Sequence, residues 1–278
     1  MKAFAMHLGL EFRFGIRNKT LLLMNYLFPL GFYALLGALM GEINPGFLTT
    51  IVPAMSLFAI MTGALLGMPD TLVSARNAGV FRSYKVNGVP AISLLAIPVA
   101  TSMIHALLVT VVIAVTAPLI FGGETPVNWA GFLLVFLVSA FALSGVGALI
   151  GVVSSNPRMT ILFSQLVFLP SMLIGGLVLP LSLLPPALAK GALLLPTSHA
   201  MDAFAGLAMG LPATQPWWSL ATLVAGGVVA FSMAVLLFSW DPSNATRRAH
   251  VAWAFLALLP YVAALIVSFS AAAVTLDV

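Results

Sequence analysis

The chain has 278 residues, of which 62% are hydrophobic and 6% charged. A soluble domain carries about a quarter charged residues, so lipid must be the solvent for most of this chain and no sizeable soluble domain is expected. The chain has no cysteine, which excludes disulfides and thiolate metal sites. A net charge of +4 would be compatible with nucleic-acid binding, but the cations gather beside apolar segments, so we expect no nucleic-acid partner.

The first 19 residues are predicted to form an amphipathic helix at the membrane interface. At helical spacing, Phe4, Leu8, Phe12 and Ile16 form one apolar stripe. The alternative is a basic flank of the first span without structure of its own. No apolar run with a small-residue cleavage site follows the first charge, so a cleavable signal peptide is not expected.

Seven apolar segments follow, each close to the length that crosses a bilayer. We expect spans at about 20–40, 47–68, 91–121, 130–153, 159–179, 217–240 and 251–274. The third is too long for a hydrocarbon core of about 30 Å and must tilt, kink at Pro98 or project from the membrane.

The basic residues determine the predicted orientation. Ten of the eleven lysines and arginines share one side if the N-terminus is cytoplasmic: Lys2, Arg13, Arg17, Lys19, Arg76, Arg82, Lys85, Arg158, Arg247 and Arg248. Only Lys190 falls outside, so the positive-inside rule predicts a cytoplasmic N-terminus. We expect the membrane to be the inner (plasma) membrane of a bacterium or archaeon. No Asp, Glu, Lys or Arg falls within an expected span, which argues against a proton-coupled carrier.

Two connecting segments are unusual. The expected cytoplasmic loop 70–90 contains Arg76, Arg82 and Lys85, and is either a solvated connector or a docking segment. The outer stretch 180–216 is apolar but interrupted by six prolines. We expect it to form short re-entrant helices, the second with Thr197 or Ser198 as N-cap, which act as a lid over a pathway or as inert packing.

Catalytic motifs are missing from the chain. There is no G-x-x-x-x-G-K-[ST] loop, so this polypeptide is not expected to hydrolyse ATP. We therefore predict that it is not an enzyme. His105 is the only histidine in an expected span, and we favour a hydrogen bond to a neighbouring helix over a role in binding substrate or a proton.

Over about residues 1–240 the pattern resembles the permeases of the second type of ABC exporters, which handle drugs, lipids and polysaccharides. The most specific stretch is SGVGALIGVVSSNPRMTILFSQLVFLPSMLIGGLVLPLSLLPPALAKGALLLPTSHAMDAF. It is similar to the family's fourth span, short turn, fifth span and outer re-entrant helices, represented here by Pro180, Pro185, Pro196, His199 and Asp202.

The 70–90 segment resembles the family's coupling segment, and we assign ATPase coupling to Arg76, Gly79, Arg82 and Lys85, with Pro90 after them. Two departures stand out. Ala75 and Asn77 occupy positions where the family usually has glutamates, and an extra apolar run, 251–274, follows the usual end of the family at about residue 240.

The resemblance implies an all-α membrane protein with six to seven transmembrane helices. Three regions follow: an interfacial helix at 1–19, the exporter-type domain at 20–240, and an extension with an extra span at 241–278. The implied partners are an ABC ATPase subunit, which would hold ATP and Mg, a second permease copy or a paralogue, and membrane lipids. This chain itself is expected to bind no cofactor and no metal.

The implied pathway lies at the dimer interface, between the second and fifth spans. Adaptable side chains there suit a hydrophobic ligand, although plain packing is the ordinary alternative: Met55, Phe58, Met61, Gln165, Phe168 and Met172. We predict an exporter permease for a hydrophobic or amphipathic substrate, with a polysaccharide still possible. A non-transporting membrane scaffold and a lipid-modifying enzyme are the alternatives.

Overall fold

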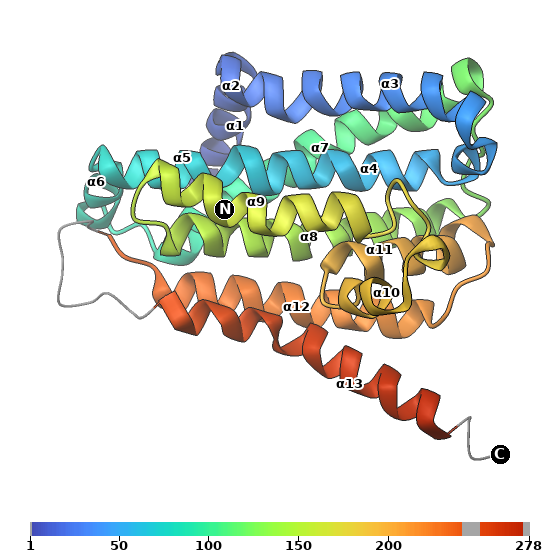
Figure 1. The fold of residues 1–278 in the computed structure, drawn as a ribbon. Helices are drawn as coiled ribbons and strands as arrows, with labels where there is room; N and C mark the ends of the chain where they lie inside the picture. Colours follow the sequence, from blue (N-terminus) through green and yellow to red (C-terminus); the bar gives the residue numbers. More distant parts are fainter. Residues whose placement is uncertain (1, 241–250, 275–278) are drawn as a thin grey trace.

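The computed structural model describes residues 2–240 and 251–274, and this part of the chain contains helices and no strand. Six helical segments are long and apolar enough to cross a membrane: Lys19–Ile43, Ile51–Asn77, Ala91–Phe121, Trp129–Val153, Pro157–Ile174 and Pro216–Leu237. They run along one common direction (Figure 1). The predicted all-helical membrane fold is therefore confirmed.

The first two spans are composite. The first consists of α2 (Lys19–Leu22), the π-helical turn η1 (Leu23–Leu27) and α3 (Phe28–Ile43). After the 3₁₀ turn η2 (Pro45–Thr49), the second consists of α4 (Ile51–Met61), the π-helical turn η3 (Thr62–Gly67) and α5 (Met68–Asn77). The remaining four are single helices: α7 (Ala91–Phe121), α8 (Trp129–Val153), α9 (Pro157–Ile174) and α12 (Pro216–Leu237).

Proline explains the position of both π-turns. Pro29 and Pro69 each lie two residues after the end of η1 and η3. A proline within a helix cannot donate the usual backbone hydrogen bond and crowds the carbonyl four residues before it. The backbone N–H of Phe28 instead bonds to the Leu23 carbonyl, and that of Met68 to the Gly63 carbonyl. These wider turns resolve the conflict without breaking either span.

The helix α1 (Lys2–Arg17) confirms the helix expected at the N-terminus, and it runs across the direction of the bundle (Figure 1). Asn18 follows α1 and is the N-cap of α2. Its side-chain oxygen accepts hydrogen bonds from the backbone N–H groups of Thr20 (2.9 Å) and Leu21 (3.2 Å). Of the predicted apolar stripe, Ile16 is exposed, as a side chain that faces lipid would be, and the position of the helix at the membrane interface stays a prediction. Other exposed apolar side chains of α1 are Met6, Leu10 and Phe14.

The second span forms the centre of the bundle, since 94% of its most apolar stretch is buried, against 22% for the fifth span. Glycines allow its close contact with α8: a methyl group at Gly147 would collide with the Ala64 carbonyl. The second span does not end near residue 68 as expected. It continues to Asn77, and α6 (Val80–Val86) follows. The predicted loop 70–90 is therefore mostly helical.

Short helices cover the end of the bundle opposite α6 (Figure 1): η4 (Leu181–Leu183), α10 (Pro186–Ala192), α11 (Pro196–Phe204) and η5 (Ala205–Met209). This agrees with short helices in the proline-rich stretch. The expected cap was wrong, because the N-cap of α11 is Leu195, whose apolar side chain accepts no hydrogen bond from the first turn. Pro196 takes the first helical position, where its missing N–H costs nothing.

The C-terminal segment consists of η7 (Val251–Leu258) and α13 (Leu259–Val274). It packs on α12, where the buried Tyr261 ring fills the space above Gly226, and α13 then diverges from the bundle (Figure 1). It is shorter than the six spans as an apolar helix. The expected family ending at Asp241 and the cations Arg247 and Arg248 lie outside the described residues.

Candidate functional site

Arg76, the first of the expected coupling residues, points into the protein. Its side chain is 6% exposed, and its guanidinium donates to the Val152 carbonyl (2.8 Å) and the Ser154 carbonyl. These carbonyls lie at the C-terminal end of α8, where the last turn of a helix leaves acceptors without partners. Arg76 therefore joins α5 to the end of α8.

Two other expected coupling residues, Arg82 and Lys85, lie on the exposed face of α6, and Gly79 precedes that helix. Gly79 has a φ of 75° and connects α5 to α6, a left-handed conformation that a residue with a Cβ rarely adopts. Arg82 and Lys85 are exposed on α6, while Phe81 is buried with its ring centroid 5.3 Å from that of Phe238. The α6 helix is thus anchored on one face and presents cations on the other.

A cavity of about 460 Å³ lies between α1, the α5–α6 connection and the start of α7. We call it the coupling cavity. Its wall includes His7 and Glu11 from α1 and Tyr84 from α6, and the His7 and Tyr84 rings lie 5.3 Å apart. Burial raises the pKa of the Glu11 carboxyl, and nearby His7 opposes that shift.

The α1 helix is attached to the bundle through His105 of α7. The Phe12 ring stacks on the imidazole with centroids 4.6 Å apart, and the imidazole Nδ1 is hydrogen-bonded to the Tyr26 hydroxyl at 2.6 Å. Gly15 lets α1 approach, since a methyl group there would lie 2.5 Å from His105 Nε2. The expected bond from His105 to a neighbouring helix is confirmed.

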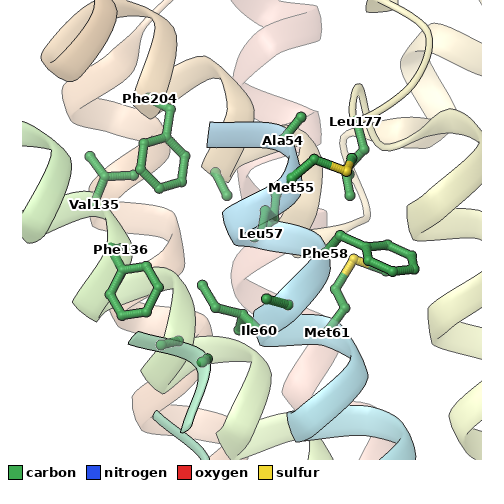
Figure 2. Close-up of a cluster of buried hydrophobic side chains, with 14 of the residues drawn as sticks. Ala54, Met55, Leu57, Phe58, Ile60, Met61, Val135, Phe136, Leu177 and Phe204 are labelled. Atoms are coloured by element: carbon green, nitrogen blue, oxygen red, sulfur yellow. The ribbon is translucent and has the colours of Figure 1, made fainter. Parts of the chain in front are cut away.

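The structure brings the expected pathway residues of the second and fifth spans together. Met55, Phe58 and Met61 project from one side of α4, away from Phe136 and Phe204 (Figure 2). The Phe58 and Phe168 ring centroids are 5.9 Å apart. All three α4 side chains are fully buried and Phe168 is nearly so, so within a single chain they form packed core.

Met172 is half-buried against the same core, whereas Gln165, one helical turn before Phe168, lines a cavity. That cavity, of about 370 Å³, lies between the first, second and fifth spans, near the end of the bundle where α1 and α6 lie (Figure 1). We call it the lateral cavity. Its wall is formed by Asn18, Thr20, Leu21, Met24, Leu66, Gly67, Asp70, Thr71, Thr160, Ile161, Ser164 and Gln165.

The expected outer residues His199 and Asp202 belong to one hydrogen-bonded network with Ser219. The Asp202 carboxylate accepts from the Ser219 hydroxyl (2.7 Å) and the Thr214 backbone N–H (2.6 Å), while His199 Nε2 pairs with the Leu193 carbonyl (2.9 Å). This network fastens α11 to the start of α12.

Burial lowers the pKa of His199, although the Leu193 carbonyl and Asp202 oppose the shift. A neutral imidazole with its Nε2–H on a carbonyl follows. Pro185 precedes α10 and Pro196 begins α11, so both prolines set helix starts in the outer cover.

Sequence reasoning missed Asn25 and Asp70. Asn25 is buried against Gly63 and Gly67, whose lack of side chains leaves room for its amide. It was detectable as the only amide within the expected first span. Asp70 was assigned to a loop, although a carboxylate one residue after Pro69 and directly after an apolar run was a visible signal.

The comparisons with known proteins agree with this architecture. The profile of the family described as "ABC-2 family transporter protein" matches residues 28–236, most of the chain and all six spans except the start of the first. Comparisons with curated proteins and with solved structures gave no significant match. The chain is a multi-pass membrane protein that belongs to the ABC-2 family of transporter proteins, as a permease component.

Proposed function

We propose that this protein is the permease subunit of an ABC exporter and moves a hydrophobic or amphipathic substrate outward across a bacterial or archaeal inner membrane. The family membership of residues 28–236 carries the proposal. Permeases of this family generally work with an ABC ATPase subunit, which supplies ATP hydrolysis. The pathway forms between two permease copies or between this chain and a paralogue.

The arrangement of the inner end supports docking of an ATPase. The crosswise helix α1 and the exposed cations Arg82 and Lys85 of α6 flank the coupling cavity. Both elements continue directly into spans, α1 through Asn18 into the first and α6 through α5 into the second. A force on either element therefore reaches the bundle without a flexible linker.

The uncharged middle of the bundle supports an apolar or amphipathic substrate. Between Ile51 and Gly67 the second span holds no ionisable residue, and the fifth holds none after Arg158. A small ion that crossed there would lose hydration without a counter-charge, whereas the apolar part of an amphiphile gains free energy when it is buried. ATP-driven alternation between two bundle arrangements would then release the substrate outside, since it stabilises one arrangement over the other.

The test is reconstitution of the chain with its ATPase in liposomes. We expect co-purification, ATPase stimulation by lipids, hydrophobic drugs or glycans, and ATP-dependent transport. The double change Arg82→Glu with Lys85→Glu should reduce stimulation, whereas Lys190→Glu, which reverses an exposed cation on α10 at the opposite end, should not. Absence of any ATPase association would support a scaffold instead.

A further inference from the structure

We propose that the lateral cavity binds the headgroup of a cationic amphiphile, with Asp70 as its counter-charge and the apolar chain lying toward Met24, Leu66 and Ile161. This inference names the substrate class of the proposed export function and in that respect rests on it. The binding step itself requires neither the ATPase nor transport.

The charge of the cavity favours a cation. Among the described residues that line it, Asp70 is the only charged one. Within the part of the chain that the structure describes, no basic side chain pairs with Asp70. Arg76, six residues further along the same helix, is held by the α8 carbonyls instead. Lys19 and Arg158 adjoin wall residues in sequence, but both are exposed and neither lines the cavity.

The remaining polar groups suit an ammonium ion. Ser164 is 2% exposed, and both its hydroxyl oxygen and Gln165 Oε1 are buried without a hydrogen-bond partner. A buried polar atom without a partner costs free energy, which a donor from a ligand would offset after a small side-chain rotation. With the Asp70 carboxylate they supply acceptors for the three N–H donors of a primary ammonium.

The depth of the site matches an amphiphile of the inner leaflet. Asp70 lies 19 residues after Ile51, which begins the second span, and thus about 28 Å along a helix that rises 1.5 Å per residue. A hydrocarbon core is about 30 Å thick, so the carboxylate reaches the inner headgroup boundary. Met24, Leu66 and Ile161 complete the wall with apolar side chains, and Ile161 is 60% exposed.

The test uses protection of a single cysteine, since the native chain has none. Ile161→Cys is placed in nanodiscs of the uncharged lipid digalactosyldiacylglycerol, so that the bilayer itself favours neither sign of charge, and is labelled with uncharged N-ethylmaleimide in the presence of decylammonium, decanol or decanoate. We expect decylammonium to protect at a concentration about tenfold lower than decanol, as for one hydrogen bond to a charged group, and decanoate to protect least.

Asp70→Asn should abolish the preference for the cation, Asp70→Glu should retain it, and Glu42→Gln, a carboxylate at the outer end of α3, should leave it unchanged. If Asp70→Glu keeps the preference for the cation, the loss of that preference in Asp70→Asn is due to the missing charge and not to misfolding. Nanodiscs that contain phosphatidylethanolamine distinguish the source: Asp70-dependent protection without added probe identifies a membrane lipid as occupant, and protection only by decylammonium identifies a soluble amphiphile.

Equal protection by the three probes, or a cation preference that survives Asp70→Asn, would overturn the proposal. So would stronger protection by decanoate. If the cation preference holds but no ATPase associates with the chain, the proposed export function fails and the binding site stands. If transport occurs without any cation preference, the export function stands and this site assignment fails.

Discussion

Arg76 allows a sharp test, because the structure gives it a role different from that of its neighbours on α6. The change Arg76→Met keeps the apolar stem of the side chain and removes the guanidinium. Two buried bonds to carbonyls at the end of α8 are then lost. The matched change Arg82→Met removes a cation from an exposed position.

The expected cost follows from those bonds. A hydrogen bond that involves a charged group contributes about 1.5–3 kcal/mol, and a buried acceptor left alone is penalised. Removal of the charge also relieves the desolvation of a buried guanidinium. We therefore expect Arg76→Met to lower the free energy of unfolding by about 2–4 kcal/mol, and Arg82→Met to change it by less than about 0.5 kcal/mol.

The assay is thermal unfolding of the purified permease in nanodiscs. For a chain of this size about 1 kcal/mol corresponds to a shift of about 2–4 °C in Tm, so Arg76→Met should unfold at least about 4 °C earlier than Arg82→Met. In the reconstituted complex, Arg82→Glu should reduce ATPase stimulation without this loss of Tm. Equal Tm values for Arg76→Met and the native chain would refute the anchor role of Arg76.

Three further predictions concern α1, the topology and the outer cover. Gly15→Ala should displace α1 and weaken cysteine cross-linking between α1 and α7, whereas Gly9→Ala, whose methyl group would meet no atom within 4 Å, should not; equal cross-linking in both would contradict the close contact. Ser83→Cys should be protected from an external impermeant thiol reagent and Thr125→Cys should react with it, and the reverse pattern would overturn the orientation. Because burial lowers the pKa of His199, the unfolded chain binds more protons below its ordinary pKa of about 6.5, so Tm should fall as the pH drops below that value. In His199→Gln this part of the pH dependence should be absent, and a pH dependence identical to that of the native chain would rule out His199 as its source.

Hydropathy was sufficient to predict the spans, because the bilayer fixes their length and excludes other backbone structures. The third and fourth spans were predicted to within one residue, and the sixth ends three residues earlier than predicted. The seventh predicted span, 251–274, is not among the six helices long enough to cross a membrane in the described part of the chain. The second span was predicted too short, because its polar end was taken for a loop. A rise in polarity does not by itself end a helix, and no residue from Pro69 to Asn77 interrupts α5.

Which way a side chain faces was less predictable. Arg76 shares its segment with Arg82 and Lys85, yet only the packing of α5 on α8 decides that it points inward. The stripe on α1 was drawn from apolarity alone, whereas the contact with α7 is determined by the space at Gly15 and by the Phe12–His105 stack. Tertiary contacts of this kind leave no periodic signal in one sequence.

The two inner cavities share part of their walls, and this has a thermodynamic consequence. Asn18, Asp70 and Thr71 line both the coupling cavity and the lateral cavity. Asn18 joins α1 to the first span, and Asp70 lies in the first turn of α5, the helix that leads to α6. The elements proposed to meet the ATPase therefore end at the wall of the proposed ligand site. A displacement of α1 or α5 cannot leave the shape of the lateral cavity unchanged.

By linkage, any effect of ATP on the affinity for a ligand in the lateral cavity must equal the effect of that ligand on the affinity for ATP. In the reconstituted complex we expect decylammonium to change the Kd of a non-hydrolysable ATP analogue by about fivefold or more, as for a coupling free energy of about 1 kcal/mol or more. The analogue should change the decylammonium concentration that protects Ile161→Cys by the same factor. Asp70→Asn should remove both effects together, because the carboxylate lies in the shared wall. If ATP affinity stays constant while the probe saturates the site, the shared wall carries no coupling and the ATPase acts on the bundle elsewhere.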